Sequence, residues 1–344
     1  MKKYLTTAIL IAAILISAGC LYAADETAED RTPLQGLDRV ESVLYGQPLT
    51  GGLLLRLSKV ERDLFGMELP GSLTERQQAL QVFVEEGNAS QPSLLFKIGV
   101  AEWVTLRRTN PSLPLSERVG HLETTLEGET QEGALSARLE RIITKLLPGG
   151  ITATQIQIPA ATVFKAKFMD TVTVRSVAVG DVVRLELEED CIINGTLAVA
   201  KGNRLFAEVA KVKLPRSFGR PSEIQFDFKN IETIGGRRIS VVIGPEAKKA
   251  MEVDSGVLGA AGASLAGAIA FGPLGIAGGF LVRGNDRQIP EGTLIYVETE
   301  EFSNVEGYTV PNLMNTMQGA DTSVSEPAET PDEQSSSPSD TVVY

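Results

Sequence analysis

The chain has few of the residues from which enzymes build active sites. Its 344 residues include one histidine, His121, and two cysteines, Cys20 and Cys191. A histidine-based triad, or a zinc site with two histidines, therefore has no residues from which to form in the second half. His121 falls on the predicted solvent side of a helix. We expect no catalytic residue, no metal site and no cofactor.

Basic residues are also scarce. Asp and Glu number 44 against 32 Lys and Arg, which gives a net charge of −12. Half of this excess lies in residues 318–344, which hold six acidic residues and no Lys or Arg. Without a basic surplus to release counterions from phosphates, we expect no nucleic-acid partner. Ser, Pro and acidic residues dominate 318–344, a composition that predicts a disordered acidic tail.

The N-terminus has a long uncharged run behind two lysines. Residues 1–24 have the layout of a bacterial-type export signal. Residues 17–20 resemble a lipobox, in which Cys20 becomes the acylated N-terminus, although Ser17 stands where leucine is usual. Ordinary cleavage near residues 23–24 and an uncleaved anchor are the alternatives. We expect the protein in the cell envelope, on the periplasmic side of the outer membrane or in the periplasm.

Cys191 is then left without a disulfide partner in the mature chain. It follows Glu186, Glu188, Glu189 and Asp190, and carboxylates next to it should raise the pKa of its thiol. The same acidic residues could bind calcium. Their alternation with leucines instead favours the solvated face of a half-buried strand.

A 20-residue unit recurs between residues 33 and 148. Each copy has a glutamate, two glycines and an arginine at five-residue spacing: Glu41-Gly46-Gly51-Arg56, Glu61-Gly66-Gly71-Arg76 and Glu123-Gly128-Gly133-Arg138. Apolar residues recur at helical spacing within each copy, and Ser72 with Glu75 spells a capping box. We predict a helical repeat domain over 33–148, each helix ending at a glycine in the left-handed conformation.

The helices should bury their apolar stripes against one another. Leu57→Asp and Leu139→Asp are expected to unfold this half because each places a charge in a buried stripe. Glu61→Ala is expected to change little. Residues 93–108 are the most apolar part and hold Trp103, the only tryptophan, so we predict that the other helices pack around them.

From residue 151 short, often alternating apolar runs bounded by glycine and proline replace the helical spacing. They predict a β domain over 151–310, a small barrel or a sandwich, and an α+β fold for the chain. A loop between two of the strands carries Arg216, Phe218 and Arg220, which could bind an anionic ligand.

A glycine-rich segment, residues 256–283, interrupts this domain. Between Asp254 and Arg283 lie 28 uncharged residues, eight of them glycine. A single membrane span would separate strands that should pair, whereas the Gly-Pro step at 272–273 permits a helical hairpin. Small residues at four-residue spacing let such helices approach closely. The predicted contacts, to a membrane or to other copies, are Gly259, Ala263, Gly267, Gly275 and Gly279. Packing on its own β domain is the alternative.

The second half resembles a family of largely uncharacterised bacterial envelope proteins. The resemblance lies in VGDVVRLELEEDCIINGTLAVAKGNRLFAEVAKV, FGRPSEIQFDFKNIETIGGRRISV and RGNDRQIPEGTLIYVE. Ala161 departs from it where a turn usually has glycine, and Asn203 where threonine is usual. The strand order is also similar to the C-terminal barrel of conjugal-transfer and type IV secretion outer-membrane subunits, in which an inserted helical hairpin enters the outer membrane. Neither resemblance brings catalytic residues.

These features predict a non-enzymatic, exported envelope protein with a structural or assembly role. The glycine-rich hairpin would attach it to the outer membrane or to other copies, as a homo-oligomer, and an envelope protein is a further possible partner. The alternatives are a periplasmic module that binds a ligand or partner through Arg216, Phe218 and Arg220, and a secretion-channel subunit.

The lipobox generates a direct prediction. Cys20→Ala should abolish labelling by a fatty-acid analogue, because the acylated thiol is gone, and should release part of the protein into the soluble fraction. Unchanged labelling would contradict the lipoprotein interpretation.

Overall fold

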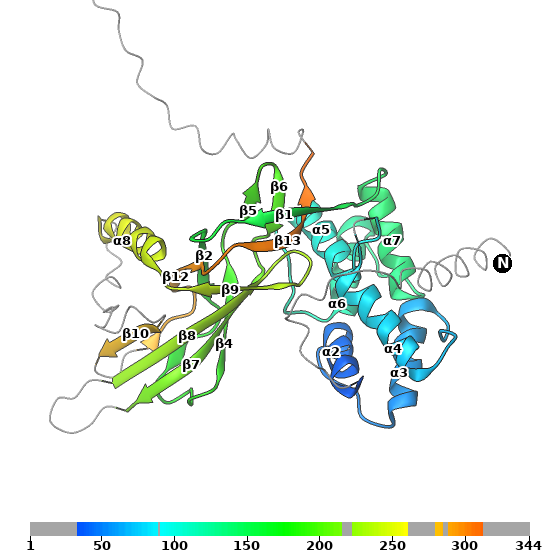
Figure 1. The fold of residues 1–344 in the computed structure, drawn as a ribbon, viewed down its shortest axis with the longest axis horizontal. Coiled ribbons are helices and arrows are strands. Elements are labelled where there is room, and N and C mark those ends of the chain that lie inside the picture. The colour runs from blue at the N-terminus through cyan, green and yellow to red at the C-terminus, as the bar shows by residue number, and fades with distance from the viewer. Residues whose placement is uncertain (1–32, 89, 215–221, 261–278, 285–287, 312–344) are drawn as a thin grey trace, which may run out of the picture. The chain divides into compact units, whose positions relative to one another are not determined.

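The structure, a computed structural model, describes residues 33–88, 90–214, 222–260, 279–284 and 288–311. Here a helical region comes first and a strand-rich region follows, with one further helix late in the chain (Figure 1). The predicted α+β fold, helices followed by a small β-barrel, is confirmed. The predicted export signal and acidic tail lie outside the described residues.

The helical region consists of short helices joined by loops. Its elements are α2 (Pro33–Tyr45), α3 (Leu53–Phe65), α4 (Leu73–Gln81), the π-helical turn η1 (Val82–Glu86), α5 (Leu94–Leu106), α6 (Leu115–Glu127) and α7 (Leu135–Leu146). Gly46, Gly66 and Gly128 follow α2, α3 and α6 with φ of +83°, +76° and +86°, the left-handed conformation predicted for them. Ser72 and Glu75 form the predicted capping box at the start of α4.

The glutamate of each 20-residue unit is buried and joins two successive helices. Glu41, Glu61 and Glu123 have no exposed surface. Each accepts two N–H groups from the arginine fifteen residues later, at distances of 2.5–3.0 Å. One carboxylate oxygen also accepts the backbone N–H eight residues later, in the intervening loop. One carboxylate therefore fixes a helix, the loop after it and the next helix.

A fourth pair follows the same plan without the same sequence pattern. Glu102 in α5 accepts from Arg118 in α6 at 2.9 and 2.7 Å, and from the backbone N–H of Asn110 at 3.0 Å. Its arginine lies sixteen residues away instead of fifteen. Arg107, with φ of +55°, takes the place of the glycine that follows α2, α3 and α6. The five-residue spacing is therefore lost, and the pair cannot be recognised from the repeat.

The expectation that Glu61→Ala changes little assumed a solvated Glu61, and that premise is wrong. The helical spacing was sufficient to place apolar residues, and Leu57 and Leu139 are fully buried as predicted. It did not show that Glu61 is buried as well, bound to Arg76, which is itself 9% exposed. Removing either partner would leave the other charge buried without its counter-ion.

The pKa of Glu123 shows how the ion pair with arginine affects the ionisation of the buried carboxyl. Burial acts to raise the pKa of this carboxyl, but the bonds from Arg138 and from the N–H of Gln131, and the charge of Arg141, outweigh it and hold the pKa below its usual value. Because the folded pKa is the lower one, this stabilisation is present above the unfolded pKa and is lost as pH falls through the folded value.

Helix α5 is the most buried of the helices. Phe96, Ile98, Val100 and Trp103 have no exposed surface. The helix contacts α6, α7 and η1 on the helical side. On the other side the Nε1–H of Trp103 donates to Asp190 in the strand-rich region at 2.8 Å. The prediction that the other helices pack around it holds for α6, α7 and η1, and the helix also lies between them and the strands.

The strand-rich region contains a closed barrel of six antiparallel strands, in the order β8-β7-β4-β2-β12-β9 and back to β8. A second sheet has the order β1-β13-β6-β5, and β3 pairs with β11. The strands are β1 (Ala153–Ile158), β2 (Val163–Phe168), β3 (Val172–Thr173), β4 (Val182–Leu187), β5 (Cys191–Ile193), β6 (Thr196–Val199), β7 (Arg204–Lys213), β8 (Ser222–Glu232), β9 (Arg238–Val242), β10 (Gly279–Gly284), β11 (Gln288–Ile289), β12 (Leu294–Thr299) and β13 (Ser303–Thr309).

Alternate residues of the barrel strands fill its interior. Phe164, Ala166 and Phe168 of β2 are buried, and the Phe168 ring meets the Phe226 ring edge to face at 5.6 Å. In the turn before β2, Ala161 has φ of +59°. This is the turn where the resemblance leads one to expect glycine, and the backbone keeps the conformation that glycine favours.

The predicted helical hairpin over 256–283 has its expected helical conformation at the first described end, residues 256–260, but that helix starts earlier than predicted, and at the second described end the helix prediction is wrong. Helix α8 (Pro245–Ala260) begins eleven residues before Gly256, because Pro245 suits a first helical position and good helix formers follow it. At the other end, residues Gly279–Gly284 form strand β10, which pairs with β8 from Ser222 to Asp227. The run Phe-Leu-Val has high strand propensity, and β8 extends past β9 and offers a free edge there. Residues 261–278 lie outside the described residues.

The buried pairs make a sharp prediction. Glu61→Ala should lower the free energy of unfolding by about 3–5 kcal/mol, because Arg76 and the N–H of Leu69 both lose their acceptor. Glu68→Ala is the matched control: its carboxylate also lies near Arg76, at 3.5 Å, but is half exposed, so less than about 1 kcal/mol is expected. Urea unfolding followed by helical circular dichroism measures both. Equal effects would contradict the role given to Glu61.

Candidate functional site

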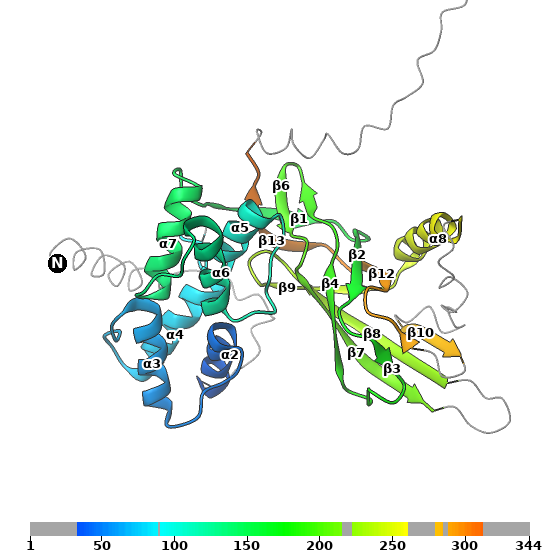
Figure 2. The same ribbon diagram turned by 180° about the vertical axis from the view of Figure 1, so that it is seen from behind.

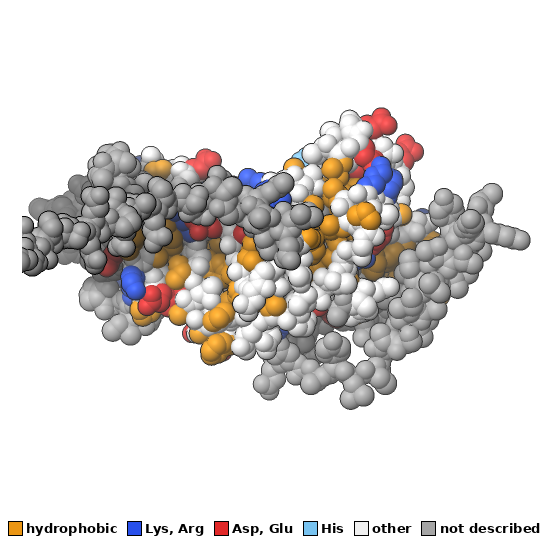
Figure 3. Space-filling view, turned by 90° about the horizontal axis from the view of Figure 1, so that it is seen from above, with side chains coloured by type: hydrophobic (Ala, Val, Ile, Leu, Met, Phe, Trp, Pro, Cys, Tyr) orange, Lys and Arg blue, Asp and Glu red, His pale blue; other side chains and the backbone are white. Residues whose placement is uncertain are grey.

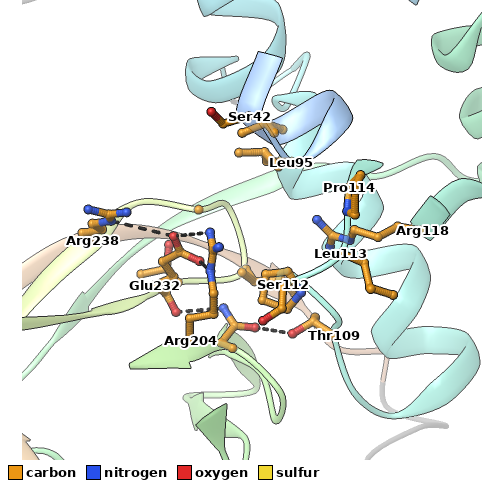
Figure 4. A pocket seen from close by; sticks show the side chains of 18 of the residues that line it. Ser42, Leu95, Thr109, Ser112, Leu113, Pro114, Arg118, Arg204, Glu232 and Arg238 are labelled. Atoms are coloured by element: carbon orange, nitrogen blue, oxygen red, sulfur yellow. Dashed lines mark hydrogen bonds and ion pairs between the residues drawn. The ribbon is translucent and has the colours of Figure 1, made fainter. Parts of the chain in front are cut away.

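A cavity of about 270 Å³ lies where the helical region meets the barrel. Its walls come from α2, α5, the loop 109–114, the start of α6, and the β7 to β9 end of the barrel (Figure 4). The cavity is thus assembled from segments far apart in sequence. No single stretch of the chain marks it.

Close backbone contact brings the two regions together beside the cavity. The N–H of Thr109 donates to the carbonyl of Lys201 at 2.8 Å. Gly202, with φ of +90°, passes so close to the Thr109 carbonyl that a Cβ would overlap it. A Cβ on Gly99 of α5 would lie 2.7 Å from the carbonyl oxygen of Ile234. Glycine is required at both places for the helical region to meet the barrel.

Asn203 adds a side-chain link at the same place. It accepts the hydroxyl of Thr109, and its amide donates to the backbone carbonyl of Glu232 at 2.8 Å. Asn203 is the second residue that departs from the resemblance, where threonine is usual. A threonine hydroxyl can also accept and donate, but its one oxygen would have to reach both partners, whereas the asparagine amide meets them with two separate atoms.

The cavity wall carries more positive than negative side chains. Arg39, Arg118, Arg204 and Arg238 line it, and Glu232 is the acidic residue among the lining set. Arg39 binds Glu85 and Arg118 binds Glu102, so these two charges are compensated from behind the wall.

Arg204 and Arg238 share one carboxylate. Arg204 donates to both oxygens of Glu232 at 2.7 Å, and the Nε of Arg238 lies 3.7 Å from the same carboxylate (Figure 4). Both guanidinium groups also lie over the ring of Phe206, at 5.3 and 4.3 Å. Guanidinium groups placed together in this way are suited to bind a carboxylate or phosphate group. The pairing of β8 with β9 brings part of this cluster together, because Glu232 stands opposite Arg238 in it.

The acidic cluster before Cys191 is taken up by ion pairs. Glu186 and Glu188 both bind Lys167, at 2.9 and 2.5 Å, and Asp190 accepts the Trp103 Nε1–H and the backbone N–H of Lys201. Across the part of the chain that the structure describes, no group of three or more His, Cys, Asp or Glu side chains could hold a metal ion.

Cys191 has the predicted ionisation. Burial, with a further contribution from the charge of Asp190, raises the pKa of its thiol to about 11. The thiol therefore stays protonated at neutral pH and is a poor nucleophile. His121 is exposed on α6, as predicted.

The glycine-rich segment is attached to the barrel at both described ends. At the first, the buried Glu298 of β12 accepts the N–H of Ala247 in α8 at 2.6 Å, and Ala247 has no exposed surface. Figure 2, which shows the molecule from behind, has α8 beside β12. At the second, Gly279 stands opposite Asp227 of β8.

The remaining predicted site residues divide as follows. Gly259 is in the last turns of α8. Cys20, the loop residues Arg216, Phe218 and Arg220, and the segment residues Ala263, Gly267 and Gly275 lie outside the described residues. Among the helices that the structure describes, none combines the length and the apolar character needed to cross a membrane.

Comparison with known proteins adds no assignment. Neither a protein-family model nor a curated protein matches the chain.

The contact beside the cavity can be tested with a pair of glycines. Gly202→Ala should destabilise the protein by about 1–3 kcal/mol more than Gly195→Ala, because both have positive φ but only residue 202 faces a backbone carbonyl. Nothing lies within 4 Å of a Cβ at residue 195, so that variant reports backbone strain alone. Thermal unfolding of the two variants measures the difference, and equal melting temperatures would count against the close approach.

Proposed function

We propose that the protein is a non-enzymatic envelope protein with a structural or assembly role, attached to the outer membrane or to further copies of itself through residues 256–283. The observation that supports this most directly is the attachment of both described ends to one barrel. Helix α8 starts under Glu298 of β12, and β10 rejoins the same barrel at β8.

This arrangement argues against a single membrane crossing. A crossing between Ala260 and Gly279 would place α8 and β10 on opposite sides of the bilayer, yet both contact the same small barrel. Both described ends of the segment are held at the barrel. An uncharged insertion held at both ends is suited to contact with a membrane or with identical insertions from other copies.

The charge distribution along α8 also supports this proposal. Its first half carries charged residues, and Lys249 and Glu246 are exposed on it. After Asp254 the helix contains no charged residue. The charged half is the one beside the barrel, and the uncharged half leads into the segment.

A second candidate is a periplasmic binding module for an anionic ligand. The shared carboxylate of Glu232 between Arg204 and Arg238 supports it. We place it second because most of the positive charge on the cavity wall already has a partner.

Replacing residues 261–278 by a short Gly-Ser linker tests the first candidate. In a Cys20→Ala chain, which removes the lipid as a second anchor, the replacement should shift the protein from the membrane fraction to the soluble fraction and reduce its size in detergent. The matched control is Arg238→Gln, which alters the cavity and leaves the segment intact, and should leave both measurements unchanged. A linker variant that stays in the membrane at full size would refute the proposal.

The single-residue version of this test is Gly267→Leu. Leucine favours a helix by roughly 1 kcal/mol over glycine, but it places a side chain where two backbones should meet. Weaker membrane association or a smaller assembly is therefore the expected result, with Leu265→Ala as the milder comparison.

A further inference from the structure

The same type of contact, between the start of one helix and the end of an earlier helix, occurs twice in the helical region. The hydroxyl of Ser116, at the start of α6, donates to the carbonyl of Leu44 near the end of α2. The hydroxyl of Ser136, at the start of α7, donates to the carbonyl of Leu64 near the end of α3, at 2.6 Å. In both cases the partners are 72 residues apart. The start of a later helix thus lies against the end of an earlier one, by the same rule.

Packing around the two contacts is equivalent as well. A Cβ on Gly46 would meet Pro114 at 3.2 Å, and a Cβ on Gly66 would meet Ala134 at 3.8 Å. The first residues of the two later helices, Leu115 and Leu135, are buried. The ends of α2 and α3 therefore cover the starts of α6 and α7.

The repeat shows which helix starts and helix ends lack a partner of this kind within the helical region. Aligning Glu41 with Glu123 makes α2 and α3 equivalent to α6 and α7. Leu34 and Leu54 then occupy the positions of Ser116 and Ser136. They are 49% and 57% exposed, and nothing in the helical array covers them as Leu44 and Leu64 cover the serines.

The end of α6 also lacks a partner of this kind within the helical region. Leu126 is equivalent to Leu44, and it is 39% exposed. Gly128 is equivalent to Gly46, and a Cβ there would meet nothing within 4 Å, whereas one on Gly46 would meet the start of α6. The chain therefore presents an uncovered helix start and an uncovered helix end that belong to one type of contact.

Exposure alone would not identify this surface. Figure 3 shows hydrophobic side chains at the surface in several separate places on one face, between charged and polar ones. What distinguishes Leu34 and Leu54 is their register: the equivalent serines are bonded to a helix end, and the exposed positions are apolar instead.

We propose that copies of this chain associate head to tail, with the start of α2 in one copy packed against the end of α6 in the next. Leu34 and Leu126 form the centre of this contact, and Leu54 extends it towards the end of α7. Such a contact uses two different surfaces, so it is heterologous and extends into a ring or a filament. The surface lies in the helical region, and the proposal does not depend on residues 256–283.

Cross-linking between chains with one cysteine each tests the direction of the contact. In a full-length Cys20→Ala, Cys191→Ala background, Leu34→Cys chains are mixed with Leu126→Cys chains and treated with a short thiol-specific cross-linker. A covalent dimer should form in the mixture and be at least tenfold less abundant in either chain alone. Dimers of Leu34→Cys chains with each other at the same yield would show a symmetric contact and overturn the proposal. So would a mixture that yields no more than Leu214→Cys with Leu126→Cys, a control in which the exposed Leu214 directly follows β7.

The size of the assembly tests the apolar character of the contact. Leu34→Ser and Leu54→Ser introduce the residue that the equivalent internal positions hold, so the fold should be kept. Each should raise the concentration at which copies associate by about tenfold in light scattering. Phe302→Ser, at a still more exposed aromatic residue of the strand-rich region, is the control and should leave this concentration unchanged. Loss of association with the linker variant of residues 261–278, but not with these serines, would refute this surface and leave the proposed attachment standing.

Discussion

The rest of the helical region depends on a buried carboxylate that accepts three hydrogen bonds. In each unit the glutamate accepts from an arginine on the next helix and from a backbone N–H in the loop between them. A buried ion pair brings little net stability compared with apolar residues of the same volume, because both ions lose their hydration. Its effect here is on geometry: the loop has one length and one path at which all three bonds form. The loop follows this path by taking a left-handed conformation at its first residue, which is a glycine in these units.

The fourth unit explains how this array meets a barrel. Glu102 and Arg118 keep the pair, while Arg107 replaces the glycine and the loop grows by one residue. The longer loop carries Thr109 to the carbonyl of Lys201. Helix α5 therefore packs against the other helices on one side and against the strands on the other. This accounts for its high apolar content. Through this one irregular unit the helical repeat contacts the strand-rich region.

Local patterns in the sequence were sufficient for the elements and not for their contacts. Helical spacing located the apolar stripes, and alternation located the strands that close the barrel. The burial of Glu61 could not be predicted, because a charged residue beside a stripe is normally solvated, and only the distant Arg76 makes burial tolerable. Strand β10 was missed for a similar reason: its residues are compatible with a helix, and the free edge of β8 decides the outcome. The arginine-lined cavity has no local signal at all, since its walls come from both halves of the chain. The fourth Glu–Arg pair was lost through one additional loop residue.

The shared glutamate also limits how such a chain can change in length during evolution. A cut between two units does not remove a self-contained block, because the carboxylate on one side of the cut is neutralised by the arginine on the other. Duplication or loss is therefore tolerable only when the segment runs from one glutamate to the next, so that every remaining carboxylate still meets an arginine. This accounts for a repeat that is strict in its charged residues and in its glycines, and permissive in nearly everything else. The array should therefore grow or shrink by whole units, apart from small changes in loop length such as the one between Glu102 and Arg118.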